Sequence, residues 1–132
     1  MFMLANNSDK GIGIDIVEVQ RIQDKMKDDN GFKQYVFSEA EIQYCERNTI
    51  RKYEHYAGRF AAKEALSKAL GVGIFGGFGL KNISVLNHEN GAPYFDFTND
   101  ARLFLEGLGI KHIHLSISHI KSTAIAMVMV EK

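Results

Sequence analysis

The sequence is poor in several features that mark particular classes of protein. Its single cysteine, Cys45, cannot form a disulfide within the chain, which favours a reducing, cytoplasmic setting. No apolar run reaches the roughly 18 residues that a membrane-spanning helix needs, so no membrane partner is expected. The first ten residues, MFMLANNSDK, lack the basic start and apolar core of a signal peptide, so none is expected. A disulfide-stabilised scaffold and an integral membrane protein are therefore not the expected classes.

The chain also has no excess of charge, with 16 basic and 16 acidic residues. A neutral chain has no broad field to attract nucleic acid or an anionic membrane, so neither partner is expected and a basic docking patch must be local. No H-x-x-x-H or C-x-x-C pair occurs, which argues against a zinc site. What remains is a chain of 132 residues, 45% of them hydrophobic, which is typical of one small globular domain spanning 1–132.

Hydrophobic periodicity predicts both strands and helices. The segment 11–19 alternates and is rich in β-branched residues, which indicates a strand. Ser38 with Glu41 three positions later is a capping-box pattern, so a helix is expected to begin near residue 39. The other expected elements are helices over 20–28, 53–70 (ending at Gly71) and 100–108, a glycine-rich loop over 71–79, a hairpin around Asn90-Gly91 over 81–98, and paired strands over 111–119 and 122–132. This order predicts an α+β fold with an antiparallel-rich sheet and packed helices.

Asp15 is a carboxylate in an otherwise apolar strand. Because successive side chains alternate between the faces of a strand, Asp15 shares a face with Gly11 and Gly13, opposite three isoleucines. An unpaired carboxylate is costly to bury, and the two glycines leave room for a ligand or another backbone. Two interpretations stay open, a ligand-binding carboxylate and a strand-end aspartate that bonds a nearby turn.

Glu64 lies among small residues on the helix expected over 53–70. Ala57 and Ala61 precede it on the same stripe, and Ser67 and Lys68 follow one turn later. An ordinary Glu64–Lys68 surface pair would stabilise the helix very little and, for this residue taken alone, is the favoured interpretation. The alternative is a carboxylate placed to hold a ligand.

His119 is the most informative histidine, because it ends the run LSISH just before a predicted turn. His55, His88, His112 and His114 show no pattern that indicates chemistry. The glycine-rich segment GVGIFGGFG matches neither a phosphate-binding P-loop nor a dinucleotide-binding motif, so neither site is expected there.

Five segments occur in a characteristic order: GIGIDIVEVQRI, FSEAEIQYC, GRFAAKEALSKALG, NGAPYF and LSISHIKSTAIAMVMVE. In this order the chain resembles the bacterial holo-acyl-carrier-protein synthases, which are small phosphopantetheinyl transferases. The resemblance covers roughly residues 11 to 131 and leaves 1–10 as an N-terminal extension. It implies a 4′-phosphopantetheinyl transferase-like fold in one small domain.

The resemblance also implies a reaction. The phosphopantetheine arm of coenzyme A moves to a serine of apo-acyl carrier protein, adenosine 3′,5′-bisphosphate leaves, and the product serves fatty acid biosynthesis. By the same resemblance, Asp15 and Glu64 are the catalytic ligands of Mg²⁺, a hard ion that takes carboxylates, waters and phosphate oxygens. The base that activates the serine stays open between a water held near the metal and His119.

Coenzyme A is assigned its own set of residues by this resemblance. They are Arg59, Ser67, Lys68, Gly71, Pro93 and His119. Lys68 is one turn beyond Glu64, where its ammonium can meet a phosphate as a point charge. The family often has threonine after the histidine, and Ile120 stands there in this chain, so one hydroxyl contact is expected to be either missing or replaced by the backbone.

Partners follow from the same family. Arg21 and Lys25 lie four residues apart on the first expected helix, and the resemblance makes this helix the docking site for an acidic acyl carrier protein. The resemblance to family members of this short type also implies a homotrimer with active sites between subunits. Two other functions stay open, a Mg²⁺-dependent nucleotide or pyrophosphate hydrolase and a non-catalytic trimer that binds coenzyme A.

Overall fold

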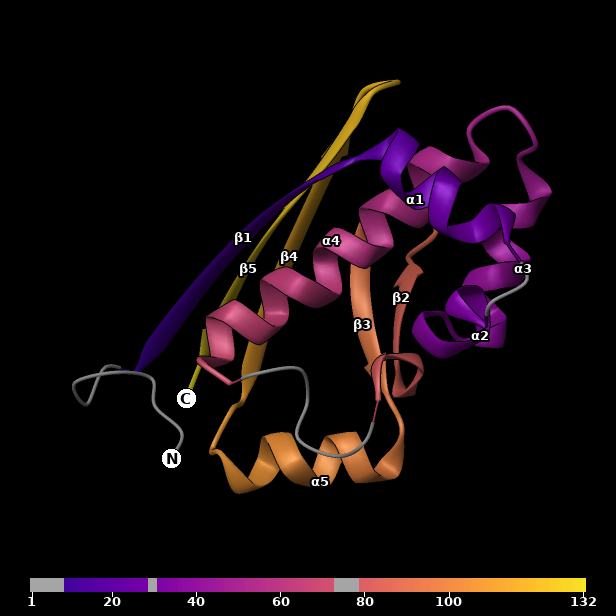
Figure 1. Ribbon diagram of the computed structural model, residues 1–132. Helices are drawn as coiled ribbons and strands as arrows, with labels where there is room; N and C mark the ends of the chain where they lie inside the picture. The colour runs from indigo at the N-terminus through magenta and orange to yellow at the C-terminus, as the bar shows by residue number, and fades with distance from the viewer. Residues whose placement is uncertain (1–8, 29–30, 73–78) are drawn as a thin grey trace.

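The computed structural model describes residues 9–28, 31–72 and 79–132. Strand β1 (Lys10–Glu18) is followed by four helices, α1 (Val19–Lys27), α2 (Phe32–Val36), α3 (Glu39–Arg47) and α4 (Lys52–Leu70). A short 3-10 helix η3 (Leu80–Asn82) leads into the hairpin β2 (Ile83–Asn87) and β3 (Pro93–Phe97), and α5 (Asn99–Gly107) precedes β4 (His112–His119) and β5 (Thr123–Glu131). The elements form two antiparallel sheets around the long helix α4 (Figure 1).

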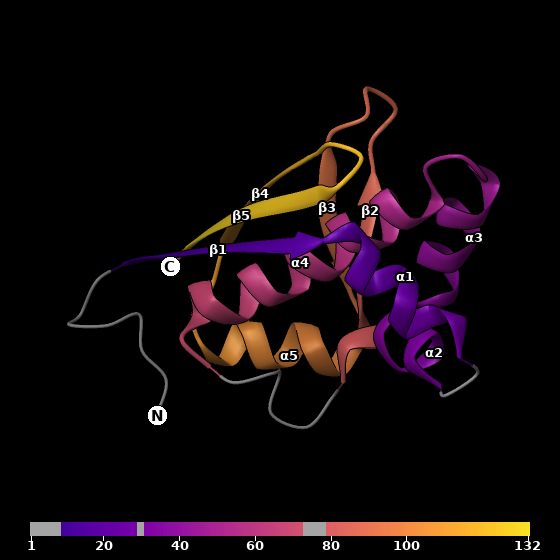
Figure 2. The ribbon, with the colours of Figure 1, turned by 45° about the horizontal axis from the view of Figure 1, so that its top comes forward.

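The larger sheet has the strand order β1-β5-β4, with the last strand of the chain in the centre. Both pairings are antiparallel, and Asp15 lies opposite Ala126 in the register. One face of this sheet packs on α4, and the alternating burial of β5 shows which residues point inward (Figure 2). Asp15 is on this inner face together with the buried Gly13 and Val17. The alternation predicted that Asp15 and Gly13 share a face, but not that this face is the inner one.

Helix α4 lies unusually close to β1 because small residues meet at their contact. A Cβ added to Gly13 would lie 2.0 Å from the carbonyl oxygen of Ala65, so only glycine fits there. Four alanines of α4, at 61, 62, 65 and 69, are buried in the core. This close approach brings Asp15 beside the second half of α4, where Glu64 and Lys68 lie.

A buried ion pair joins α4 to the helical end of the molecule. The Lys63 ammonium donates to Oε1 of Glu41 (2.6 Å) and to the carbonyl oxygens of Val36 (2.7 Å) and Leu80 (3.0 Å). Glu41 also accepts hydrogen bonds from the backbone N–H groups of Ser38 and Val85. Both charged side chains are fully buried, so this one cluster connects α2, α3, α4, η3 and β2.

Most of the expected elements are confirmed, together with the α+β class. The capping box of Ser38 and Glu41 is present, Gly71 ends α4 in the left-handed conformation (φ 71°), and Gly91 has φ 91° in the hairpin loop. The five-residue helix α2 was not predicted, because one helical turn shows no periodicity. The loop expected over 71–79 falls mostly outside the described residues, as does most of the extension over 1–10.

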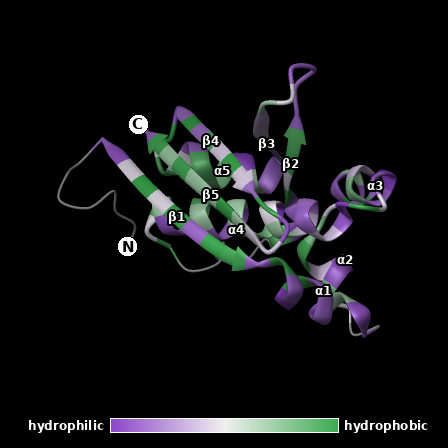
Figure 3. Ribbon diagram, turned by 90° about the horizontal axis from the view of Figure 1, so that it is seen from above, coloured by the Kyte–Doolittle hydropathy of each residue, from purple (hydrophilic) through white to green (hydrophobic). Residues whose placement is uncertain are grey.

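The outer face of the larger sheet has an apolar surface, and no helix in the described part of the chain lies over it (Figure 3). Ile12, Ile14 and Ile16 of β1 are 67%, 55% and 67% exposed, and Met127 of β5 is 46% exposed. The register places Ile14 beside Met127, and the β4 residue next to Met127 is Ser116. The uncovered face is therefore apolar on β1 and β5 and more polar on β4.

Candidate active site

Asp15, Glu64 and Lys68 form a charged cluster where β1 crosses α4. The Lys68 ammonium lies 3.1 Å from Oδ1 of Asp15 and donates to the carbonyl oxygen of Ile14 at 3.0 Å. The favoured sequence interpretation, a Glu64–Lys68 surface pair, is not what the structure shows, since Lys68 pairs with a residue 53 positions away. The cluster thus joins two elements instead of stabilising one helix.

The two carboxylates of this cluster affect each other. Partial burial raises the pKa of Glu64 above its ordinary value, the negative charge of Asp15 raises it further, and Lys68 lowers it. Asp15 is itself only 17% exposed. Two carboxylates that repel each other, with the Lys68 ammonium as their neighbouring cation in the described part of the chain, are an arrangement that a divalent cation would stabilise.

The donors of this cluster fit Mg²⁺. This ion is usually held by one or two carboxylates, with waters and substrate phosphates filling its other positions. Among the described residues, no group of three or more His, Cys, Asp or Glu side chains could hold a metal ion. Two carboxylates would match the number of protein ligands that Mg²⁺ usually takes, so Asp15 and Glu64 stay the predicted pair.

Two of the residues assigned to coenzyme A have structural contacts at the end of α4. The Ser67 hydroxyl is buried and donates to the carbonyl oxygen of Val72 at 2.6 Å. Gly71 provides the left-handed turn that ends the helix, and its N–H donates to the carbonyl oxygens of Lys68 and Ser67. Their contacts with coenzyme A stay predictions.

A second group of predicted residues lies on another side of α4. Arg59, Pro93 and His119 line one cavity of about 190 Å³ between α4, the β2–β3 hairpin and the end of β4. Since α4 turns by about 100° per residue, Arg59 and Glu64 point roughly 140° apart around its axis. Within one chain, the predicted site is therefore divided into a carboxylate half and a cationic half.

Arg59 is a buried cation without a carboxylate partner in the described part of the chain. It is 4% exposed, its guanidinium lies 4.1 Å from the centroid of the Tyr44 ring, and Nη2 donates to Oδ1 of Asn87 at 2.8 Å. Its Nε is buried and has no hydrogen-bond partner among the described residues. A buried charge is costly unless it is paired, so this cavity is suited to an anion.

The structure adds His55 and Glu54 to this half, although no sequence pattern gave His55 a chemical role. The ring of His55 lies 5.5 Å from that of His119, and Oε1 of Glu54 lies 2.7 Å from Nδ1 of His119. Burial and the nearby Arg59 and His119 lower the pKa of His55, so this ring adds no positive charge near neutral pH. One sequence signal was available, because His55 precedes Arg59 by four residues on a predicted helix.

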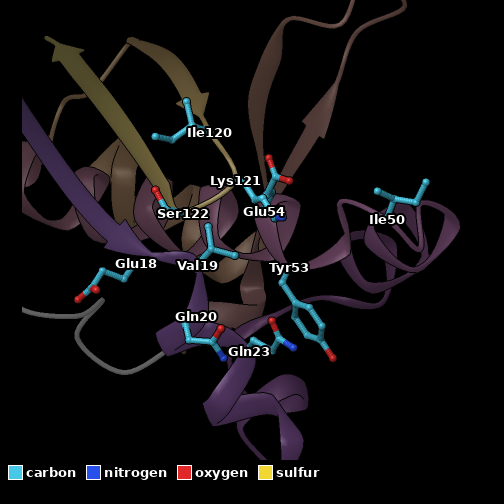
Figure 4. Close-up of a pocket in the computed structure, with 10 residues that line it drawn as sticks. All are labelled: Glu18, Val19, Gln20, Gln23, Ile50, Tyr53, Glu54, Ile120, Lys121 and Ser122. Atoms are coloured by element: carbon cyan, nitrogen blue, oxygen red, sulfur yellow. The ribbon is translucent and has the colours of Figure 1, made fainter.

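The largest cavity, of about 570 Å³, lies between α1 and the β4–β5 turn (Figure 4). Gln20 and Gln23 line it from α1, Glu54 from α4, and Ile120 and Lys121 from the turn. Glu54 borders this cavity and the one around Arg59, so the two open on either side of it.

The predicted docking residues lie on α1, next to this largest cavity. Arg21 and Lys25 are both exposed, and Lys25 extends over the ring of Phe32 at 5.5 Å from its centroid. Cys45, in contrast, is fully buried, and burial raises the pKa of its thiol to about 12. The cysteine is thus part of the core and not a nucleophile.

Comparisons with known proteins agree with this geometry. The family model described as the 4′-phosphopantetheinyl transferase superfamily matches residues 11–128. A holo-[acyl-carrier-protein] synthase of Cytophaga hutchinsonii is 44% identical over 125 residues, which cover 93% of this chain and 98% of the relative. A solved holo-[acyl-carrier-protein] synthase of Neisseria meningitidis superposes with a TM-score of 0.84 at 34% identity, covering 92% of this chain and 98% of that one. The enzyme from Bacillus anthracis, solved in complex with CoA (3′,5′-ADP), gives a TM-score of 0.76 at 36% identity and covers 92% and 96% of the two chains.

Proposed function

The chain belongs to the 4′-phosphopantetheinyl transferase superfamily, and we propose that it acts as a holo-[acyl-carrier-protein] synthase. It transfers the 4′-phosphopantetheine group of coenzyme A to a serine hydroxyl of apo-acyl carrier protein and releases adenosine 3′,5′-bisphosphate. The observation that most supports this proposal is the electrostatic interaction of Asp15 with Glu64 and Lys68, from elements far apart in sequence, since carboxylates are ligands that Mg²⁺ takes. The remaining features concern how the two substrates are held.

The proposed reaction depends on stabilising the charge of the phosphates more than on a nucleophile from the enzyme. The serine oxygen forms a bond to the phosphorus that bears pantetheine, and the bond from this phosphorus to the oxygen bridging the pyrophosphate breaks. When bound, Mg²⁺ supplies neutralisation of the charge on the pyrophosphate oxygens. Asp15 and Glu64 would hold the ion, and Lys68, 3.1 Å from Asp15, is within reach of a phosphate that binds there.

Arg59 and His119 are proposed to bind the anionic nucleotide end of coenzyme A. Their shared cavity contains a buried guanidinium that lacks a carboxylate, and Pro93 forms part of its wall. A phosphate bound there would supply the missing negative charge. A role for His119 as the base that activates the serine requires this half of the site to meet the carboxylate half.

We propose that a homotrimer joins the two halves between subunits. The support is the uncovered apolar face of β1 and β5, where Ile12, Ile14 and Ile16 are each more than half exposed. Exposed apolar surface of this kind marks an association site. A light-scattering mass close to that of a single 14.8 kDa chain, at concentrations where the protein is active, would contradict the trimer.

The carrier protein is proposed to dock on α1 through Arg21 and Lys25, which are exposed beside the largest cavity. We further propose that the enzyme acts in the cytoplasm, in fatty acid biosynthesis. No helix in the described part of the chain is long and apolar enough to cross a membrane.

The test is mass spectrometry of an apo-acyl carrier protein incubated with this protein, coenzyme A and Mg²⁺. A mass gain equal to one phosphopantetheine group on the carrier, absent without Mg²⁺, is the expected result. Cleavage of coenzyme A without any carrier would instead indicate the hydrolase, and tight binding without turnover would indicate a non-catalytic trimer.

A further inference from the structure

His119 is held by a carboxylate for which the proposed reaction has no role so far. Its Nδ1 lies 2.7 Å from Oε1 of Glu54, and the two side chains are 25% and 14% exposed. An ionised carboxylate only accepts hydrogen bonds, so the imidazole must donate through Nδ1. Glu54 therefore determines which ring nitrogen carries the proton and which, Nε2, is left for other partners.

The surroundings of this pair point to an anionic ligand at Nε2. His119 and Glu54 both line the cavity that contains Arg59, and no hydrogen bond to Nε2 of His119 occurs within residues 9–28, 31–72 and 79–132. The other ring nearby, His55, has a lowered pKa and so brings no competing charge near neutral pH. The cavity thus contains the guanidinium of Arg59 and Nε2 of His119, and the hydrogen bond between Nδ1 and Glu54 fixes the orientation of this ring.

We propose that Glu54 is a positioning residue for coenzyme A, which holds Nδ1 of His119 as a hydrogen-bond donor and so directs Nε2 toward a phosphate oxygen. When the ligand binds, Nε2 takes up a proton from solvent, so that Nδ1 donates to Glu54 and Nε2 donates to the phosphate. Carboxylates behind histidines act in this way on metal ligands and catalytic bases, where they orient the ring without touching the substrate. This inference rests on the proposed function, since it takes the anion to be a phosphate of coenzyme A.

A purely structural role is the competing explanation, because the same hydrogen bond joins α4 to the end of β4. The two explanations differ in what they predict for ligand binding. If the role is only structural, Glu54→Gln would lower the free energy of unfolding and leave the ligand affinity of the folded protein unchanged. If Glu54 positions His119, the same variant would change the affinity of a protein that stays folded.

The first experiment measures binding of adenosine 3′,5′-bisphosphate by calorimetry, without carrier protein or turnover. Glu54→Gln and His119→Ala are each expected to raise the Kd about tenfold, the size of one hydrogen bond to a charged group. The double variant should bind no more weakly than His119→Ala, because both changes remove the same interaction. The matched control is Glu131→Gln, which breaks a histidine–carboxylate pair of the same 2.7 Å length, to His114, away from these cavities.

The second experiment reads the tautomer directly, from long-range ¹H–¹⁵N spectra of the histidine side chains at a pH where His119 is neutral. The proton should be on Nδ1 in the wild-type protein, and this preference should weaken in Glu54→Gln and in the shorter Glu54→Asp. Wild-type affinity in Glu54→Gln, additive effects in the double variant, or a wild-type proton on Nε2 would each overturn the inference. A wild-type protein that fixes the Nδ1 tautomer and yet binds no bisphosphate would contradict the coenzyme A assignment, and with it the phosphate role of this pair.

Discussion

Helix α4 carries two lysine–carboxylate pairs five residues apart, and their surroundings are opposite. Lys63 and Glu41 are both fully buried, with 2.6 Å between Nζ and Oε1. Lys68 is 56% exposed and Asp15 17% exposed, with 3.1 Å between Nζ and Oδ1. A lysine and a carboxylate thus form a fully buried cluster at Lys63 and Glu41, which we call the closed cluster. They form a partly exposed one at Lys68, Asp15 and Glu64, which we call the open cluster.

The difference lies in how many hydrogen bonds the protein itself provides. Around Lys63 and Glu41, three oxygens surround the ammonium, and the carboxylate accepts from two backbone N–H groups as well. Around Asp15 the protein provides one ammonium, and burial together with the charge of Asp15 raises the pKa of Glu64. A cluster saturated by protein groups stabilises the fold, whereas one left short of positive charge is suited to bind a cation.

The largest expected effect is on stability, in the closed cluster. Glu41→Ala should lower the free energy of unfolding by about 3–5 kcal/mol, because it leaves the Lys63 ammonium buried without its counter-charge. The N–H groups of Ser38 and Val85 lose their acceptor as well. Urea unfolding followed by circular dichroism measures the change.

The matched control is the open cluster. Asp15→Ala should cost less than about 1 kcal/mol, since the exposed Lys68 ammonium can turn to water. Equal decreases of stability in the two variants would contradict the distinction between a closed and an open pair.

The two clusters also differ in how far the sequence alone could describe them. The capping box of Ser38 and Glu41 is a local pattern and was predicted, but the ion pair with Lys63 depends on a partner 22 residues away. The alternation of β1 placed Asp15 on the same face as Gly13, and only the packing of β1 on α4 shows that this face is the inner one and that Lys68 pairs with Asp15. Patterns within three or four residues therefore predicted the helices and strands, whereas the pairs between residues far apart in the sequence were found only in the structure.

The same limit explains what was missed around His119. Its position at a strand end was predicted, and the family resemblance added Arg59 and Pro93. Glu54 gave no local signal and His55 only its spacing of four residues from Arg59, because their partner His119 is more than 60 residues away and reaches them only when β4 packs on α4.

The second expected effect is on activity, in the open cluster. Asp15→Asn and Glu64→Gln should each lower kcat/KM for carrier modification at least a hundredfold while the protein stays folded. Removing a carboxylate takes away a ligand of the ion that stabilises the pyrophosphate charge, a term of several kcal/mol. The rate of carrier modification, followed by mass spectrometry, is the measurement.

Asp96→Asn provides the control for these variants, because Asp96 is an exposed carboxylate on β3 and lines none of the cavities described above. Its activity should match the wild type. Near-normal activity of Asp15→Asn or Glu64→Gln at saturating Mg²⁺ would show that the open cluster is not the metal site.

A smaller effect is expected on α1, outside both clusters. Arg21→Glu should raise the KM for the acyl carrier protein by roughly tenfold and leave the KM for coenzyme A unchanged, because an exposed charge acts on the encounter with an acidic partner. Initial rates with each substrate varied in turn separate the two constants. Arg102→Glu, an exposed charge reversal on α5, is the control, and equal effects of the two variants would mean that α1 is not the docking helix.

The smallest effect concerns the charge balance of the open cluster itself. Burial and the charge of Asp15 raise the pKa of Glu64, whereas Lys68 lowers it. Lys68→Met should therefore move the titration of Glu64 to higher pH, Lys68→Arg should leave it nearly unchanged, and Asp15→Asn should move it to lower pH. The ¹³C shift of the Glu64 carboxyl carbon, followed against pH, measures each midpoint.

Since a proton and a metal ion compete for this carboxylate, binding of Mn²⁺, which accepts the same oxygen ligands, should weaken on acidification at a higher pH in Lys68→Met than in the wild type. A Glu64 midpoint that responds to neither Lys68 nor Asp15 would mean that the three side chains do not form one electrostatic unit.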